Sequence, residues 1–402
     1  MRTTMATENN NKTLNVPNLR FPEFSEEWER KKLGDIGTTL IGLTYSPLDV
    51  VPSDGTIVLR SSNIKGGLLD YTDLVRVNKK IKESIITRAN DILICARNGS
   101  ARLIGKNAIL KDSDCGHTFG AFMMVYRSED NPFVHQLLST KRYYSQVAEN
   151  LGARINQITT SDLNSFEFSF PQSKKEKVKI AGMLSLLDER IATQIKIIED
   201  LKKLKSAITH LHFDAAIDKY YSAYIGDCIE QVSQRNKDGK VKEVLSVSNK
   251  NGFVNQSEQF EDREIASEDT SNYKVVHTND FAYNPARINV GSVARLHNYA
   301  CGIVSPMYIC FHTKPMLLPE YFEHIFSTSY FRHEMHKRLE GSVRLCLTYD
   351  SLCNIKIALP SIDEQKQFVS QISAIISKII NEDRLLTLYQ TLKRYLLSQM
   401  FI

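Results

Sequence analysis

Loops rich in side chains that can recognise nucleic-acid bases occur in both halves of the chain. Each follows a strand-like run and mixes Arg, Lys, Asn, Ser and Gly. Arg can donate to guanine N7 and O6, and Asn or Gln can pair with adenine N6 and N7, so these loops predict hydrogen bonding to base edges. The loops are RSSNIKGG (60–67), ARNGSAR (96–102) and GARINQITT (152–160) in the first half, and SVSNKNG (246–252), NPARINVGSVAR (284–295) and GSVRLCLTY (341–349) in the second.

The polar side chains of these loops are the candidate DNA contacts. The first half contributes Arg60, Asn63, Arg97, Asn98, Ser100, Arg154, Asn156 and Gln157, and the second contributes Ser248, Asn249, Lys250, Asn284, Arg287, Asn289, Ser292, Arg344 and Tyr349. Arg97 and Arg287 stand at matching points of the two halves, which favours them over the others. The alternative is that Gly, Ser and Asn clusters after strands form turns and that exposed Arg is only solvated.

The sequence gives no support for three catalytic chemistries. NPAR (284–287) lacks the second Pro and the aromatic residue of the N-P-P-[YF] motif, which would stack on a flipped base. No phosphate-binding G-x-x-x-x-G-K-[ST] loop is present. PSIDEQK (360–366) resembles a nuclease P-D…E-x-K motif, but helix capping and the helix dipole explain its carboxylates. We therefore expect a non-catalytic chain that binds no metal.

Composition sets loose bounds on the partners and the compartment. The 402 residues carry 51 Lys+Arg against 46 Asp+Glu, a net charge of +5 that permits a polyanionic partner without demanding one. Seven scattered cysteines without C-x-x-C pairs favour free thiols over a metal site. The polar first residues and the absence of an apolar run near ~20 residues predict a cytoplasmic chain with no membrane partner.

A strand, a proline and a capped helix occur twice. FEFSFP (166–171) precedes Ser173 and Glu176, and IKIALP (355–360) precedes Ser361 and Glu364. Both are S-x-x-E capping boxes, in which the Ser and Glu side chains satisfy free amides at a helix start. Apolar residues then recur three or four apart to the end of each segment, which predicts two long amphipathic helices.

The repeat extends through the segments upstream of these helices. RANDILICAR (88–97) aligns with HTNDFAYNPAR (277–287), and LRF (19–21) corresponds to LHF (211–213). The predicted divisions are a disordered tail at 1–16, a first domain at 17–171, a central helix at 172–213, a second domain at 214–360 and a distal helix at 361–402. If the helices pack antiparallel, the chain gains a pseudo-twofold axis, and a helix of about 40 residues spans about 60 Å.

The long helices carry more apolar residues than the contact between two helices would bury. Ile195, Leu204, Ile376 and Ile380 lie beyond a strict a/d pattern, so we expect them to dock partner proteins. Two similar domains on stiff helices would suit an elongated, nearly twofold ligand such as duplex DNA.

The order and duplication of these motifs resemble the specificity subunit of type I restriction-modification systems. The resemblance rests on VPNLRFPEFSEEWERKKLGDI (16–36), the DIL…R stretch and the strand-Pro-cap-helix units at 166–213 and 355–402. It implies two tandem target recognition domains of mixed α/β (α+β) fold, each reading half of a split DNA site. It also implies that the helices form an antiparallel coiled-coil-like spacer that docks two adenine-N6 methyltransferase subunits, onto which restriction subunits assemble. S-adenosylmethionine, ATP and Mg would then be bound by the partners and not by this chain.

Three other functions remain open on the sequence. A similar chain can serve an enzyme in which one polypeptide both cleaves and methylates. A repressor-like protein without enzymatic partners would also use duplicated DNA readers. A coiled-coil scaffold that never touches DNA would show no steep salt dependence of binding, whereas phosphate contacts give a log-log slope of roughly −0.9 each.

Overall fold

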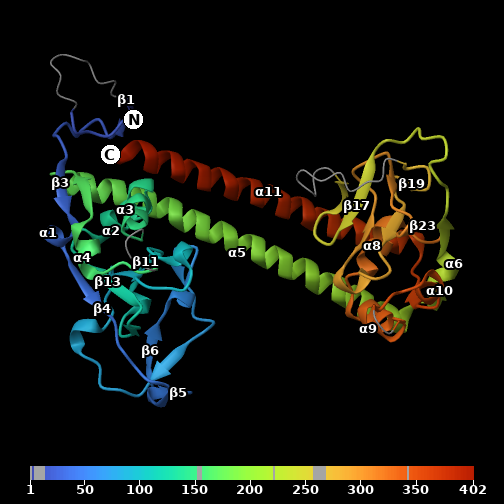
Figure 1. Ribbon diagram of the computed structural model, residues 1–402, viewed down its shortest axis with the longest axis horizontal. Coiled ribbons are helices and arrows are strands. Elements are labelled where there is room, and N and C mark those ends of the chain that lie inside the picture. Colours follow the sequence, from blue (N-terminus) through green and yellow to red (C-terminus); the bar gives the residue numbers. More distant parts are fainter. Residues whose placement is uncertain (1, 4–13, 152–155, 221, 257–268, 342–343) are drawn as a thin grey trace. The chain divides into compact units, whose positions relative to one another are not determined.

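The computed structural model describes residues 2–3, 14–151, 156–220, 222–256, 269–341 and 344–402 (Figure 1). The predicted disordered tail therefore lies largely outside the described residues. The chain divides into two compact units. Unit 1 comprises Met1–Ile195 and Arg384–Ile402, and unit 2 comprises Lys196–Asp383. Both long helices, α5 (Lys174–Lys219) and α11 (Ile362–Met400), contribute residues to both units.

Each unit is built on a four-stranded antiparallel central sheet with the same strand order. In unit 1 the order is β11 (Asn107–Ile109), β10 (Ile92–Cys95), β13 (Met123–Arg127) and β4 (Thr38–Ile41). In unit 2 it is β21 (Val293–Arg295), β20 (Phe281–Tyr283), β23 (Ile309–Thr313) and β16 (Ile229–Val232). The matching order confirms the repeat inferred from sequence.

A second sheet differs between the units. Unit 1 has β12 (Thr118–Phe119), β6 (Thr56–Leu59), β9 (Val75–Val77) and β5 (Val50–Val51), in that order. Unit 2 has β18 (Gly252–Asn255), β17 (Val244–Ser248), β22 (Cys301–Val304) and β19 (Lys274–His277). Both contain one parallel pair, β6 with β12 and β17 with β22. The antiparallel neighbour of β17 follows it directly as a hairpin, whereas β6 pairs with the later β9.

One turn shows the repeat at the level of single residues. Asn90 and Asn279 both take positive φ, at 65° and 75°, in the left-handed region that Asn tolerates. The following residues, Asp91 and Asp280, both accept a hydrogen bond from the backbone N–H three residues earlier, at 2.9 and 2.7 Å. The aligned RANDIL and HTNDFA segments therefore form the same turn before β10 and β20.

Short helices and strand pairs complete each unit around the central sheet. Unit 1 has β3 (Glu29–Lys32) paired with β14 (Glu167–Phe170), and the helices α1 (Leu33–Ile36), α2 (Asn131–Leu137), α3 (Lys141–Leu151) and α4 (Thr160–Ser165). Unit 2 has β15 (Ser222–Tyr224) paired with β24 (Lys356–Ala358), and α6 (Ile225–Cys228), α8 (Pro319–Ile325), α9 (Ser329–Lys337) and α10 (Tyr349–Cys353). Unit 1 also contains the short pairs β1 (Arg2–Thr3) with β2 (Leu19–Arg20) and β7 (Ile64–Lys65) with β8 (Leu68–Leu69).

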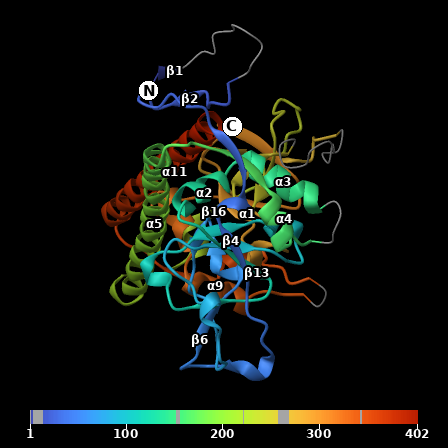
Figure 2. The same ribbon diagram turned by 90° about the vertical axis from the view of Figure 1, so that its left-hand side faces the viewer.

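The central sheet of unit 1 separates two hydrophobic cores, because side chains alternate between the faces of a strand. Ile92 and Ile94 of β10 face the helices, whereas Leu93 and Cys95 face the second sheet. Figures 1 and 2 both place β4 and β13 between α2 and the second sheet around β6. Unit 2 repeats the arrangement, with Phe281 in one core and Ala282 in the other.

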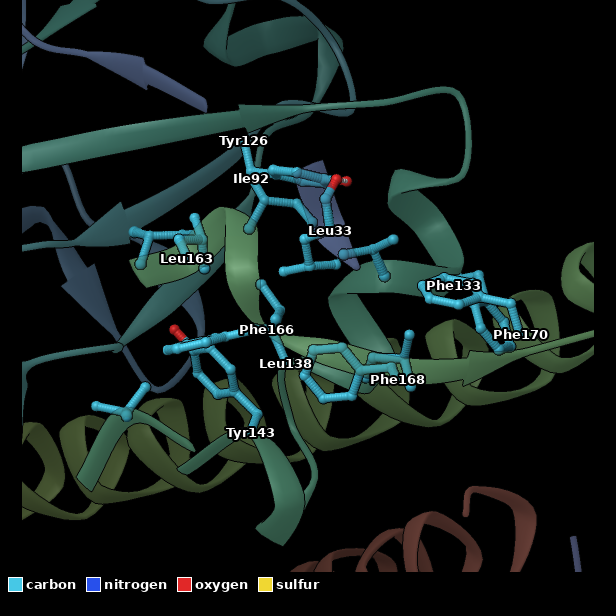
Figure 3. Packing of buried hydrophobic residues seen from close by; sticks show 14 of the residues in the cluster. Leu33, Ile92, Tyr126, Phe133, Leu138, Tyr143, Leu163, Phe166, Phe168 and Phe170 are labelled. Atoms are coloured by element: carbon cyan, nitrogen blue, oxygen red, sulfur yellow. Dashed lines mark hydrogen bonds between the residues drawn. The ribbon is translucent and has the colours of Figure 1, made fainter. Parts of the chain in front are cut away.

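Aromatic residues pack against one another in the helix-side core of unit 1 (Figure 3). Phe133 of α2 packs on Phe170 of β14 with ring centroids 5.8 Å apart. Phe401, just beyond the end of α11, lies 5.4 Å from Phe133 and 6.3 Å from Trp28. The last residues of the chain therefore complete a core that its first domain begins.

The two long helices pair in opposite directions. In unit 1, Asp188 of α5 forms an ion pair with Lys393 near the end of α11, with an Oδ1 to Nζ distance of 2.5 Å. In unit 2, Phe213 near the end of α5 lies 5.3 Å from Phe368 near the start of α11. Each unit thus joins the start of one helix to the end of the other, as antiparallel packing requires. No helix in the described part of the chain is long and apolar enough to cross a membrane.

Only one of the two predicted capping boxes forms completely. At the start of α11, the Glu364 carboxylate accepts from the Ser361 N–H at 3.1 Å, and Ser361 Oγ accepts from the Glu364 N–H at 3.4 Å. At the start of α5, Ser173 Oγ accepts from the Glu176 N–H, but the Glu176 carboxylate receives Arg20 instead, at 2.7 and 2.8 Å. The prediction of a reciprocal box at Glu176 is therefore wrong, because a buried cation competes for its carboxylate.

Candidate nucleic-acid interface

A groove of about 760 Å³ lies at one end of the sheets of unit 1. Its walls are the loops that follow β4, β6 and β10, the segment from Asp73 to Val75 at the start of β9, and the turn that precedes β13. Gly42 lets the loop after β4 lie against Gly120, which lines the groove, since a Cβ at position 42 would lie 2.2 Å from the Gly120 carbonyl oxygen. Of the predicted contacts, Arg60, Arg97 and Asn98 line this groove.

Arg60 is held by an acidic neighbour that sequence reasoning missed. Its Nη2 donates to Asp73 Oδ2 at 2.8 Å, and the Arg60 and Asp73 side chains are 33% and 66% exposed. Asn63, another predicted contact, is fully buried: its Oδ1 accepts from the Arg60 N–H, and its Nδ2 donates to the Asp70 and Asp73 carbonyls. Direct base contact by Asn63 is therefore not supported, because its amide is used within the loop.

Arg97 is exposed and lies over an aromatic ring at the groove. Its guanidinium carbon is 5.2 Å from the centroid of Phe122, a side chain that is 59% exposed. The Arg97 backbone forms an isolated antiparallel bridge with Gln157, so the predicted loops around 97 and 157 meet. This brings two of the three predicted segments of the first half together.

The remaining candidates of unit 1 tie the loops to one another. Asn98 Nδ2 donates to Ser61 Oγ at 3.0 Å, and Asn98 Oδ1 accepts from the Ser100 N–H at 3.0 Å. Asn156, at φ 50°, donates to the Gly99 carbonyl at 2.9 Å. Ser100 and Asn156 are half-buried. Arg154 lies outside the described residues.

In unit 2 the candidates divide into exposed and buried sets. The exposed side chains are Asn249, Lys250, Arg287, Asn289 and Arg344. Ser292 is 2% exposed and donates to the Val247 carbonyl, and Asn284 is 8% exposed and accepts from the Ala286 N–H. Ser292 and Asn284 therefore hold the loop that carries Arg287, and the structure does not support direct base contact by either.

Two further candidates of unit 2 have local structural roles. Ser248 Oγ accepts from the Lys250 and Asn251 N–H groups, which shapes the β17–β18 turn. Tyr349 is half-buried against the helix-side core, and burial raises the pKa of its hydroxyl. Its ring therefore contributes to packing at the start of α10.

The loop after the first central strand was missed in both units. In unit 1 it places Tyr45 in the groove described above. In unit 2 the equivalent loop follows β16, and Gln234, Arg235 and Lys237 line a groove of about 520 Å³ with Asn272. The position of these loops in the repeat could have identified them, because both follow the same strand of the repeat.

The predicted docking residues on the helices are mostly accessible. Ile195, Leu204 and Ile380 are 37%, 48% and 46% exposed. Ile376 instead packs against the helix-side core of unit 2, so its assignment to a docking surface is corrected. The helical period brings it onto the face that meets this core.

Residues 25–203 match the family model described as the type I restriction modification DNA specificity domain. The chain carries a type I DNA specificity domain. Two curated relatives share 28% identity over 195 residues, which cover 46% of this chain and 42% of each relative. They are the type I restriction enzyme StySPI specificity subunit of Salmonella potsdam and the EcoKI specificity subunit of Escherichia coli strain K12.

A solved structure extends the likeness to the whole fold. The S subunit of a type I restriction-modification system from M. genitalium matches with a TM-score of 0.61 at 16% identity, covering 96% of this chain and 99% of that one. The specificity domain matched by the family model ends within α5, so unit 2 is related through fold and internal repeat. Together these findings support a specificity subunit of a type I restriction-modification system.

Proposed function

We propose that this chain is the DNA-recognition subunit of a type I restriction-modification complex, and that each unit reads one half of a split site. The observation that carries the proposal is the repeated exposed arginine after the second strand of each central sheet. Arg97 follows β10 and Arg287 follows β20, and each stands on a loop held by buried or half-buried polar side chains. Arg donates two parallel hydrogen bonds to guanine in the major groove.

The two half-sites should be unlike. The groove of unit 1 combines Tyr45 and Phe122 with its arginines, whereas the groove of unit 2 is lined by Arg235, Lys237 and amide side chains. Their second sheets also differ in strand pairing. Different side chains presented from one scaffold favour an asymmetric DNA sequence.

The long helices would set the gap and dock two methyltransferase subunits. The exposed Ile195, Leu204 and Ile380 support this role, because solvent-exposed apolar side chains on one helix pair favour a protein partner. Restriction subunits would join the same complex. In this assembly the chain itself is non-catalytic, and the partner subunits bind S-adenosylmethionine, ATP and Mg.

The test is a methylation map of genomic DNA from cells that co-express this chain with its cognate methyltransferase. The expected result is N6-methyladenine in a motif of two unlike halves separated by a fixed gap. The control is the same cells without this chain. Methylation that does not depend on the chain would contradict the proposal, and a repressor-like or scaffold role would then be preferred.

A further inference from the structure

We infer that Arg60 and Asp73 of unit 1 together read one G·C base pair, with guanine facing Arg60 and cytosine facing Asp73. The inference rests on the proposed recognition of DNA and adds a specific base pair to the half-site of unit 1. Both side chains line the same groove and are joined by the 2.8 Å hydrogen bond between Arg60 Nη2 and Asp73 Oδ2.

The pair is held by a buried polar scaffold. Asn63, which is fully buried, accepts from the Arg60 N–H at 2.9 Å and donates to the Asp73 carbonyl at 2.8 Å. One amide therefore fixes the backbone of both readers. The neighbouring Ser61 is tied to Asn98 at 3.0 Å, which connects this loop to the one that carries Arg97. An ordinary solvated ion pair does not need such support.

Asp73 indicates base edges and not phosphates as the ligand of this groove. A carboxylate that is 66% exposed repels the phosphate backbone, but it can accept a hydrogen bond from cytosine N4. Arg60 is 33% exposed. Among the described residues its Nε is buried without a hydrogen-bond partner and its Nη2 donates to Asp73, so Nη1 is the donor left to meet guanine. The apolar Phe122, which lines the same groove, also suits a base edge.

The experiment compares Arg60→Ala and Asp73→Ala in the full chain, each co-expressed with the methyltransferase, by methylation mapping. Base pairs are written with the base facing Arg60 first. Arg60→Ala should still accept G·C and should newly accept T·A, because cytosine and adenine both offer an amino group to Asp73. A·T and C·G should stay excluded, because thymine O4 and guanine O6 and N7 are acceptors that repel the carboxylate. Discrimination between G·C and T·A should fall by between about 5-fold and 150-fold.

Asp73→Ala should relax the same single position, while the other half of the motif stays intact in both variants. That intact half also reports that the variant chains fold. Lys65→Ala is the matched control: it removes one partner of an ion pair with Asp70 at 2.8 Å, close in sequence but outside the groove lining, and should leave the motif unchanged.

Two results would overturn the inference while the proposed function stands. One is a split motif that keeps every position strict in Arg60→Ala. The other is equal acceptance of all four base pairs in Arg60→Ala, which would mean that Asp73 only holds Arg60 in place. Failure of the unmodified chain to direct any split motif would instead contradict the proposed function itself.

Discussion

The buried ion pair between Arg20 and Glu176 links β2 of unit 1 to the start of α5. Arg20 is 7% exposed and Glu176 is 1% exposed, and Trp28 Nε1 donates to the same carboxylate at 3.3 Å. Glu176→Gln would leave the Arg20 charge buried without a counter-charge. We expect a loss of about 3–5 kcal/mol in the free energy of unfolding, measured by urea denaturation.

The repeat supplies the control for this prediction. Glu364→Gln changes the equivalent position at the start of α11, where the carboxylate caps Ser361. Because Gln also serves in a capping box, Glu364→Gln should lower the free energy of unfolding by less than about 1 kcal/mol. Equal losses in the two variants would show that leaving Arg20 without a counter-charge adds no cost.

Replacing the equivalent carboxylates Asp91 and Asp280 with Asn should change the free energy of unfolding in opposite directions. Asp91 binds Arg127 at 2.7 and 2.8 Å, whereas the strand register places His312 at that position in unit 2. Burial raises the pKa of Asp280 above its ordinary value. Because the pKa of Asp280 is higher in the folded chain than in the unfolded chain, the protonated side chain favours the folded state. This stabilisation is fully present below about pH 4, the pKa of Asp in the unfolded chain, and is lost as the pH rises through the folded pKa.

Asp280→Asn should therefore raise the free energy of unfolding at pH 7, and this gain should shrink as the pH falls toward 4. Asp91→Asn should lower the free energy of unfolding at pH 7 by about 1–3 kcal/mol, because Arg127 loses a charged hydrogen-bond partner. Urea denaturation at the two pH values checks both. A loss of stability in Asp280→Asn at pH 7 would count against the argument.

At the scale of the elements, the two faces of α5 should have separable roles. Leu204 is 48% exposed and Leu184 is fully buried in the core of unit 1. Leu204→Asp should leave the free energy of unfolding within about 0.5 kcal/mol and weaken capture of the methyltransferase by at least about tenfold. Leu184→Ala should instead cost about 2–5 kcal/mol of stability. A pull-down and urea denaturation on both variants measure this. Undiminished capture by Leu204→Asp would remove this residue from the docking surface.

At the scale of the whole molecule, a substitution in one of the duplicated readers should relax the specificity of only one half of the motif. Arg97→Ala should relax one half of the methylated motif, and Arg287→Ala should relax the other, each by about 1–3 kcal/mol of discrimination. Methylation mapping of the two variants gives both halves in one comparison. Equal relaxation of both halves by either variant would indicate a shared contact or a general loss of binding.

The sequence by itself determined the repeat, the two long helices and the loops that carry the candidate readers. Helix periodicity and strand alternation are local properties, and an aligned turn such as that of Asn90 and Asn279 depends on neighbouring residues only. The Ser361 and Glu364 box also formed as predicted, because its partners are three residues apart. Three of the predicted readers, Arg60, Arg97 and Asn98, accordingly line one groove.

Only the tertiary structure decided which polar side chains remain free to bind. The Glu176 carboxylate binds Arg20, 156 residues away, and does not cap its helix. The Asn63 amide donates to backbone carbonyls that the fold of the loop places next to it. Asp73 and Phe122 carry no local signal, yet folding brings them to the groove. A buried polar group must find a partner wherever the chain supplies one, so its availability depends on long-range contacts that periodicity and spacing do not contain.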